Sequence, residues 1–231
     1  MKSDKSIGRL AGIIFTINLV PYVIAHMVIL DGILFSENLL QSVRDHRFEV
    51  GLSVLMEFTS LTAMIAFAVL LFPVLRKHGN RLSIAYLGLR FVEFGIIIFS
   101  FITLMSIARM STDILVMSLD QQAIYESIAS SQFIVWKWTG IIYMLVYALH
   151  CVTFFYILFK SKLVPRLISV LGFVSIFFAS LNLLDHLFDL DFGGFYLFAP
   201  MGIVELLLAT WLIRYGLKGK KARTTVRTSF T

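Results

Sequence analysis

The 231-residue chain is 58% hydrophobic, contains 22 phenylalanines and is only 15% charged, whereas soluble domains are about 45–50% apolar and about 25% charged. This composition excludes an ordinary soluble domain and favours a protein embedded in a lipid bilayer. The net charge of +6 does not indicate nucleic-acid binding, because the Lys and Arg residues lie in short clusters between apolar segments. The single cysteine, Cys151, excludes an intramolecular disulfide.

Several apolar segments are long enough to cross the bilayer as helices, which takes about 20 residues for a hydrocarbon core of about 30 Å. The predicted spans are 7–30, 50–75, 82–108, 133–159, 164–186 and 194–217. The first is too long for a secretory signal peptide and lacks a cleavage site. We therefore predict an all-α fold, a polytopic transmembrane helical bundle with six spanning helices. Residues 1–217 form this single domain, and residues 218–231 form a flexible basic cytoplasmic tail.

The connections between these spans alternate in charge. The basic ones are the N-terminus with Lys2, Lys5 and Arg9, the turns at 76–81 and 160–166, and the segment 214–223. The others, 31–49, 110–132 and 189–194, are longer or acidic. Because cytoplasmic loops are enriched in Lys and Arg, both termini are predicted to be cytoplasmic. The two long outer connections are either short amphipathic helices on the membrane surface or ordered loops.

Polar residues at membrane depth are costly and usually face the interior of a bundle, so each is a site candidate. With a rise of about 1.5 Å per residue, Asn18, Glu93, His150 and Glu205 fall at one level near the bilayer centre. Arg90 lies about one turn closer to the cytoplasm. These five residues are the predicted ligand-binding or proton-relay site.

A charge count sharpens this prediction. Arg90 is the one permanent cation of the layer, against the carboxyls of Glu93 and Glu205. Arg90 can pair with Glu93 on its own helix or bridge to Glu205 through its planar guanidinium. One carboxyl then remains, and in low dielectric it is protonated unless His150 is cationic or a ligand supplies charge. The alternative is a structural network that only fixes helix register.

A second polar layer is predicted nearer the outside, formed by His26, Glu57, Lys137, Asp185 and His186. Two histidines and two carboxylates (His26, Glu57, Asp185, His186) are ligand types that suit Zn or Fe. They match no metal-binding motif, and interfacial anchoring explains the same residues. A haem would need two axial ligands at one depth, which His26 and His186 could provide. The sequence identifies no cofactor and no nucleotide-binding fingerprint.

Four segments together resemble the bacterial membrane proteins grouped as domain-of-unknown-function family 4386. They are "RLAGIIFTINL", "YLGLRFVE", "YILFKSKLVPRLISVLG" and "PMGIVELLLATWLIRYG". The resemblance covers most of the chain and implies the six-helix layout and a bacterial inner-membrane location. The family's recurring features fall on Arg90 and Glu93, on Ser161, Leu163, Pro165 and Arg166, and on Pro200 and Glu205. The resemblance implies no activity.

Three hypotheses for the function follow. The first is binding or permeation of a small solute, proton or ion at the midplane layer, with Pro200 kinking the last helix near Glu205. Six helices leave little room for alternating access, so permeation favours a homo-oligomer. The second is an intramembrane enzyme acting on a lipid or quinone, with Glu93 or Glu205 as general base. The third is a non-catalytic sensor or assembly protein with a structural polar core. The lipid bilayer is the predicted partner, with a small-molecule or lipid ligand.

Overall fold

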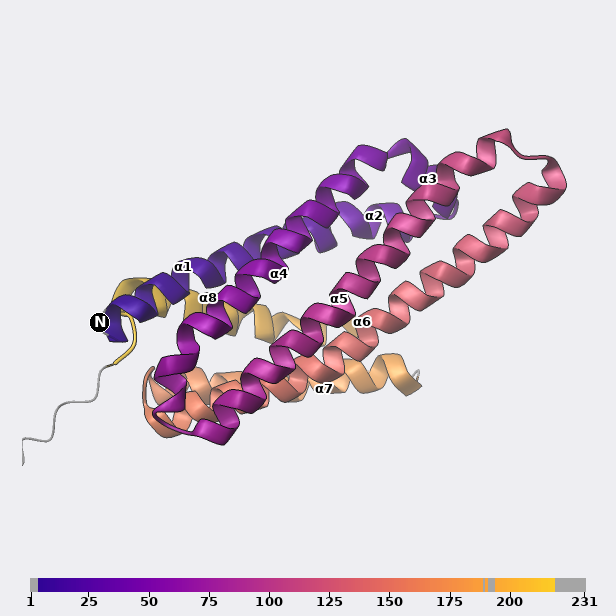
Figure 1. Cartoon of the computed structure of the whole chain (residues 1–231). Helices are drawn as coiled ribbons and strands as arrows, with labels where there is room; N and C mark the ends of the chain where they lie inside the picture. Colours follow the sequence, from indigo (N-terminus) through magenta and orange to yellow (C-terminus); the bar gives the residue numbers. More distant parts are fainter. Residues whose placement is uncertain (1–3, 189, 191–193, 219–231) are drawn as a thin grey trace, which may run out of the picture.

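The computed structural model describes residues 4–188, 190 and 194–218, and within these ranges the chain is helical and contains no strand. Six long helices make up the body of the fold (Figure 1). They are α1 (Asp4–Val23), α4 (Arg47–Arg76), α5 (Asn80–Asp113), α6 (Leu119–Ser161), α7 (Arg166–Phe188) and α8 (Ala199–Tyr215). Apart from Lys218, the predicted C-terminal tail lies outside the described residues.

Shorter elements join these helices. A π-helix, η1 (Ile24–Leu30), continues α1 and leads into α2 (Asp31–Leu34) and α3 (Leu39–Asp45). Two short 3-10 helices follow α5 and precede α8: η2 (Ile114–Val116) and η3 (Gly194–Leu197). The connection 31–49 therefore contains short helices, as one of the two sequence interpretations expected.

The long helices form a closed ring. Each packs against the next in chain order, α1 on α4, α4 on α5, α5 on α6, α6 on α7 and α7 on α8, and α8 packs back on α1. Successive helices run in opposite directions along the bundle (Figure 1). The side chains that point inward from this ring form the core and leave room for a cavity.

Five of these helical segments in the described chain are long and apolar enough to cross a membrane. They are Asp4–Leu34, Arg47–Arg76, Asn80–Val116, Leu119–Ser161 and Arg166–Phe188. Helix α8 has 17 residues and is therefore about 25 Å long, shorter than a typical hydrocarbon core. The structure thus supports a helical membrane protein with five such segments.

The described ends of the chain meet at the same end of the bundle. Lys77 Nζ lies 3.1 Å from a carboxylate oxygen of Asp4. Arg9 donates a hydrogen bond of 3.2 Å to the carbonyl oxygen of Arg214. The amide of Lys218 donates to the carbonyl of Leu163 at 2.9 Å. The first turn of α1, the α4–α5 turn, the α6–α7 turn and the end of α8 thus form one end of the molecule (Figure 1).

Helices α1 and α8 approach closely because α1 presents glycine at the contact. A Cβ atom added at Gly12 would lie 2.7 Å from the backbone nitrogen of Ile213. One at Gly8 would overlap the backbone nitrogen of Leu217. Small residues at a helix interface are the usual means of close packing in membranes.

Two expectations about the helices were wrong. The segment 110–132 is not a long connection between two spans, because α5 continues to Asp113 and α6 begins at Leu119. A capping box formed by Ser118 and Gln121 starts α6 there. Pro200 does not kink the last helix, because α8 begins at Ala199 and a proline in the first turn lacks only an amide that has no helical partner.

Candidate functional site

A cavity of about 270 Å³ lies inside the ring of helices. Its wall is built from α1, η1, α4, α5, α6, the start of α8 and Phe198, which precedes α8. Apolar side chains such as Leu61, Met64 and Ile97 form part of the wall. The polar lining residues are Asn18, Tyr22, Glu57, Ser60, Arg90, Tyr143, Tyr147 and Glu205. A few polar groups on a mostly apolar wall are typical of small-molecule sites.

The cavity is elongated along the bundle. On α5, its lining runs from Arg90 to Ile97, and on α4 from Met64 to Glu57. Seven residues of helix correspond to about 10 Å. Arg90 lies toward the end where the chain termini meet, and Glu57 lies toward the opposite end, because α4 and α5 run in opposite directions. The cavity therefore has ionisable groups at two levels.

Behind the wall lies a buried ionic network. Arg90 Nη1 donates to Glu93 Oε2 at 2.9 Å, and the two side chains are one turn apart on α5. The other carboxylate oxygen, Oε1, is hydrogen-bonded to Nδ1 of His150 on α6. Glu93 is fully buried and His150 is 1% exposed. Of the two pairings expected for Arg90, the structure has the one with Glu93.

Two further contacts complete this network. Arg90 Nε donates to the hydroxyl of Tyr86 at 3.5 Å, and the guanidinium carbon lies 5.6 Å from the centre of the Tyr86 ring. His150 Nε2 lies 3.3 Å from the sulfur of Cys151. Because the Glu93 carboxylate accepts from Nδ1, we assign Nε2 as the acceptor of the Cys151 thiol proton. His150 is then neutral, and Glu93 balances the charge of Arg90.

One guanidinium nitrogen of Arg90, Nη2, is accessible from the cavity. The side chain is only 5% exposed and lines the cavity. Among the described residues, none accepts a hydrogen bond from Nη2. Nη2 is not completely enclosed by protein atoms, so it is accessible from the cavity. A buried donor of this kind calls for an acceptor, from water or from a ligand.

Glu205, on α8, places an acidic side chain on the cavity wall. Its Oε1 accepts a hydrogen bond of 2.8 Å from the hydroxyl of Tyr147. Within the described part of the chain, Glu205 has no cationic partner within 4.0 Å. Since Glu93 already balances Arg90, the carboxyl of Glu205 is the uncompensated charge that the sequence analysis anticipated. The Glu205 carboxyl group is therefore either protonated or available to pair with a positive charge.

Three aromatic side chains on the cavity wall lie close to one another, and one of them, Tyr147, contacts Glu205. The ring centres of Tyr143 and Tyr147 are 5.8 Å apart, and those of Tyr147 and Phe198 are 5.9 Å apart. All three residues line the cavity. The carboxyl group of Glu205 is thus bonded to the middle member of a set of three aromatic side chains, two from α6 and one from the residue before α8.

At the other level of the cavity, α1 departs from α-helical geometry. His26 lies in the π-helix η1, and its Nδ1 is 3.1 Å from Oε1 of Glu57. The His26 ring also stacks on the rings of Tyr22 and Trp136, whose centres lie 5.3 Å and 5.6 Å from the centre of the His26 ring. π-Helical segments are rare and occur often at functional sites. One turn along α4, Ser60 donates to the carbonyl of Asn18 at 2.6 Å, which joins α4 to α1.

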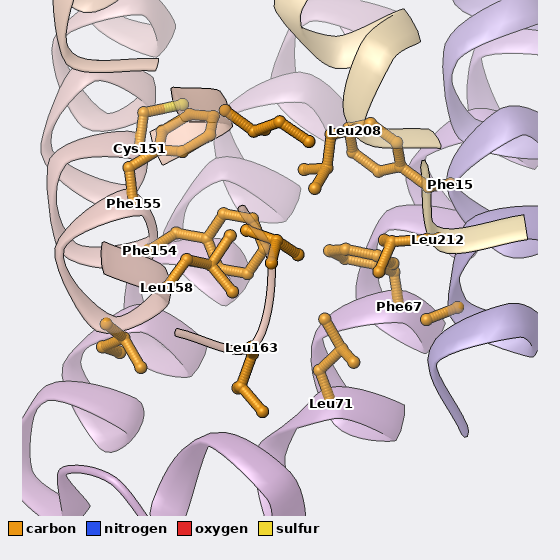
Figure 2. Close-up of a cluster of buried hydrophobic side chains, with 14 of the residues drawn as sticks. Phe15, Phe67, Leu71, Cys151, Phe154, Phe155, Leu158, Leu163, Leu208 and Leu212 are labelled. Carbon is orange, nitrogen blue, oxygen red and sulfur yellow. The ribbon is translucent and has the colours of Figure 1, made fainter. Parts of the chain in front are cut away.

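One to two helical turns beyond the cavity, toward the chain termini, lies a layer of four aromatic rings, which we call the aromatic floor: Phe15, Phe67, Phe154 and Tyr86. Successive ring centres lie 4.9, 5.9 and 5.0 Å apart. The four residues come from α1, α4, α6 and α5, and each is at most 4% exposed. Below them, side chains from α4, α6 and α8, including Leu71, Leu158 and Leu212, fill the bundle (Figure 2). This packing closes the cavity at that end.

The outer-layer residues do not gather into a metal site. His26 pairs with Glu57, whereas His186 Nδ1 lies 2.8 Å from the carbonyl oxygen of Asn182 on its own helix, α7. Asp185 is on α7 as well. Over the part of the chain that the structure describes, no group of three or more His, Cys, Asp or Glu side chains is placed to hold a metal ion.

The structure divides the five residues predicted from depth into two sets. Arg90, Glu205 and Asn18 line the cavity, whereas Glu93 and His150 lie behind its wall, bonded to Arg90 or to each other. Tyr147, Tyr143 and Ser60 line the cavity but were not among the predicted site residues, and Glu57 was predicted to lie in a separate outer layer. The helical spacing of Tyr143, Tyr147 and His150 on α6 was the signal that could have found the two tyrosines.

Comparison with protein families gives a match over most of the chain. Residues 10–216 match the model of the family described as Domain of unknown function (DUF4386). The chain belongs to this family. The match includes every residue of the cavity wall and of the buried network, so both lie within the DUF4386 region. A search of curated proteins gave no match, and neither did a search of solved structures.

Proposed function

We propose that this DUF4386 protein binds a small solute in the cavity between Arg90 and Glu205. The observation that carries the proposal is a cavity within the helical bundle whose walls present a buried cationic donor, Arg90 Nη2, and a carboxyl group, Glu205, without an ionic partner among the described residues. Unpaired charges inside a bilayer are expensive, and they are usually retained for a ligand or an ion. Glu93 and His150 take the role of positioning residues that hold Arg90 in place.

Binding is favoured over free permeation because of the aromatic floor. A continuous path toward the chain termini would have to pass Phe15, Phe67 and Phe154, which are packed against one another and buried. In this conformation the packed rings separate the cavity from the end of the bundle where the chain termini meet. Permeation of a solute, proton or ion requires those rings to move apart, so it is the second candidate function.

An intramembrane enzyme acting on a lipid or quinone receives less support. Within the part of the chain that the structure describes, the one arrangement that resembles a nucleophile and base is Cys151 beside His150. Both side chains are buried, and neither lines the cavity. A bound substrate would therefore reach Glu205 or the tyrosines, but no thiol.

We further propose that α8 is a sixth span and that both termini are cytoplasmic, in the bacterial inner membrane. The basic turns and the described chain ends share one end of the bundle, as the distribution of Lys and Arg requires for the cytoplasmic side. Aromatic and basic residues near the end of α8, such as Trp211 and Arg214, suit a helix end at the interface.

Access to the cavity can be tested at Gly202, which lines it and has no atom within 4 Å of an added Cβ. In proteoliposomes, Gly202→Cys should react with a charged methanethiosulfonate reagent applied at the non-cytoplasmic side. Gly95→Cys is the matched control, because it lies on an exposed face of α5 predicted to contact lipid. The native Cys151 is 4% exposed and gives little background. Equal, slow reaction of both variants would contradict the proposed site.

A further inference from the structure

The charges of the cavity specify what the occupant must carry. Glu93 balances Arg90, whereas Glu205 has no cationic partner among the described residues. At the other level, Glu57 is paired with His26, which carries at most one positive charge. In its ionised form, Glu205 is therefore a carboxylate of the cavity wall that lacks a balancing cation among the described residues. A positively charged group placed beside Glu205 balances that carboxylate, and a negatively charged group placed there is repelled.

The three aromatic side chains of the cavity wall also favour an occupant with a positively charged group. Tyr143, Tyr147 and Phe198 form a contiguous set of ring faces on the cavity wall. Ammonium groups are attracted to aromatic faces, and groups of aromatic side chains bind methylated and other organic cations in other proteins. A carboxylate beside the rings adds direct charge pairing.

The opposite wall adds a second requirement. Arg90 Nη2 is a charged donor without an acceptor in the described chain, and the side chain is 5% exposed. A ligand oxygen, above all a carboxylate, satisfies this atom. Between the two polar walls, Leu61, Met64 and Ile97 leave space for an apolar body. The cavity volume of about 270 Å³ is at the small end of ligand sites.

We infer that the ligand is a small zwitterion, with its ammonium group at Glu205 and the rings of Tyr143, Tyr147 and Phe198, and its carboxylate at Arg90. This inference rests on the proposed function, because it names the class of solute bound in the same cavity. It distinguishes amino-acid-like and betaine-like molecules from simple anions, neutral lipids and quinones.

The test uses zwitterions and isosteres that lack the positive charge. Glycine betaine is compared with 3,3-dimethylbutanoate, in which carbon replaces the quaternary nitrogen, and 4-aminobutanoate is compared with pentanoate. Thermal unfolding of the purified full-length protein in detergent, followed by tryptophan fluorescence, reports binding as a rise in Tm. At least one zwitterion should raise Tm at millimolar concentration, and its isostere should not. If neither zwitterion exceeds its isostere, the inference is overturned.

Variants locate the effect. Glu205→Gln should weaken binding of the effective zwitterion by about tenfold or more, since one charge-assisted contact is lost. Glu126→Gln, an exposed position on the same α6 helix as the tyrosines, should leave affinity unchanged. Tyr143→Leu removes one ring of the aromatic set without removing a hydrogen bond of the Arg90 network, and it should also weaken binding. Unchanged affinity in both Glu205→Gln and Tyr143→Leu would contradict the assignment.

Failure of this inference is distinguishable from failure of the proposed function. If Gly202→Cys reacts with the charged reagent but no zwitterion binds better than its isostere, the cavity is an accessible site for another class of solute. If Gly202→Cys does not react, the cavity itself is not a binding site.

Discussion

His150 on α6 is hydrogen-bonded to Glu93 on α5, and this contact links the two helices at the level of the cavity. The same carboxylate also receives Arg90 at 2.9 Å. Glu93 thus has two tasks: it balances a buried cation, and it orients the guanidinium so that Nη2 remains free for the cavity. Its removal should affect both stability and binding.

Glu93→Gln leaves Arg90 buried without a counter-ion. Breaking a buried ion pair by removing one partner costs about 3–5 kcal/mol, so a substantial loss in the free energy of unfolding is expected. Glu126→Gln, at an exposed position, should change it by less than about 0.5 kcal/mol. Unfolding in detergent with increasing denaturant measures both. A Glu93→Gln protein as stable as the unchanged chain would show that the network does not hold α5 and α6 together.

Gly12→Leu should separate α1 from α8. Even the first added carbon would lie 2.7 Å from the backbone nitrogen of Ile213, which no side-chain rotation relieves. We expect a fall in stability of about 1–3 kcal/mol, as for other overpacked sites. Gly95→Leu is the control, because nothing lies within 4 Å of an added Cβ there. Similar melting temperatures for the two variants would contradict the close packing of α1 on α8.

The sidedness of α8 can be tested with cysteines at its two ends. Tyr196 is 86% exposed just before α8, and Lys218 is exposed just after it. In cells with a permeabilised outer membrane, an impermeant maleimide should label Tyr196→Cys at once and Lys218→Cys only after lysis. Lys77→Cys, in the α4–α5 turn, should behave as Lys218→Cys does. Immediate labelling of both Tyr196→Cys and Lys218→Cys would mean that α8 does not cross the membrane.

The level of the polar residues could be predicted from the sequence because helical rise is constant. Counting residues from the basic turns was enough to place Asn18, Arg90 and Glu205 near one another, and all three line one cavity. The contact between Arg90 and Glu93 also follows from spacing, since residues three apart face each other on a helix. The match to DUF4386 agrees with the resemblance noted from four sequence segments.

Contacts between helices could not be predicted in the same way, because hydropathy does not fix the rotation of a helix about its axis. Tyr147 reaches Glu205 only because of how α6 and α8 are turned, and Ser60 reaches Asn18 for the same reason. The π-helix around His26 has no clear sequence signature beyond Pro21 in the turn before it. Pro200 was misplaced because a proline marks either a kink or a helix start, and periodicity alone does not separate the two.

The most direct test of the central claim is an experimental structure of the full-length protein in a lipid nanodisc, at a resolution that defines side chains. We predict Arg90 bonded to Glu93, a cavity that separates Arg90 Nη2 from Glu205, and density for an occupant between them when the effective zwitterion is present. A closed bundle in which Arg90 pairs directly with Glu205 and no cavity remains would contradict the claim, because the polar layer would then only hold the helices together.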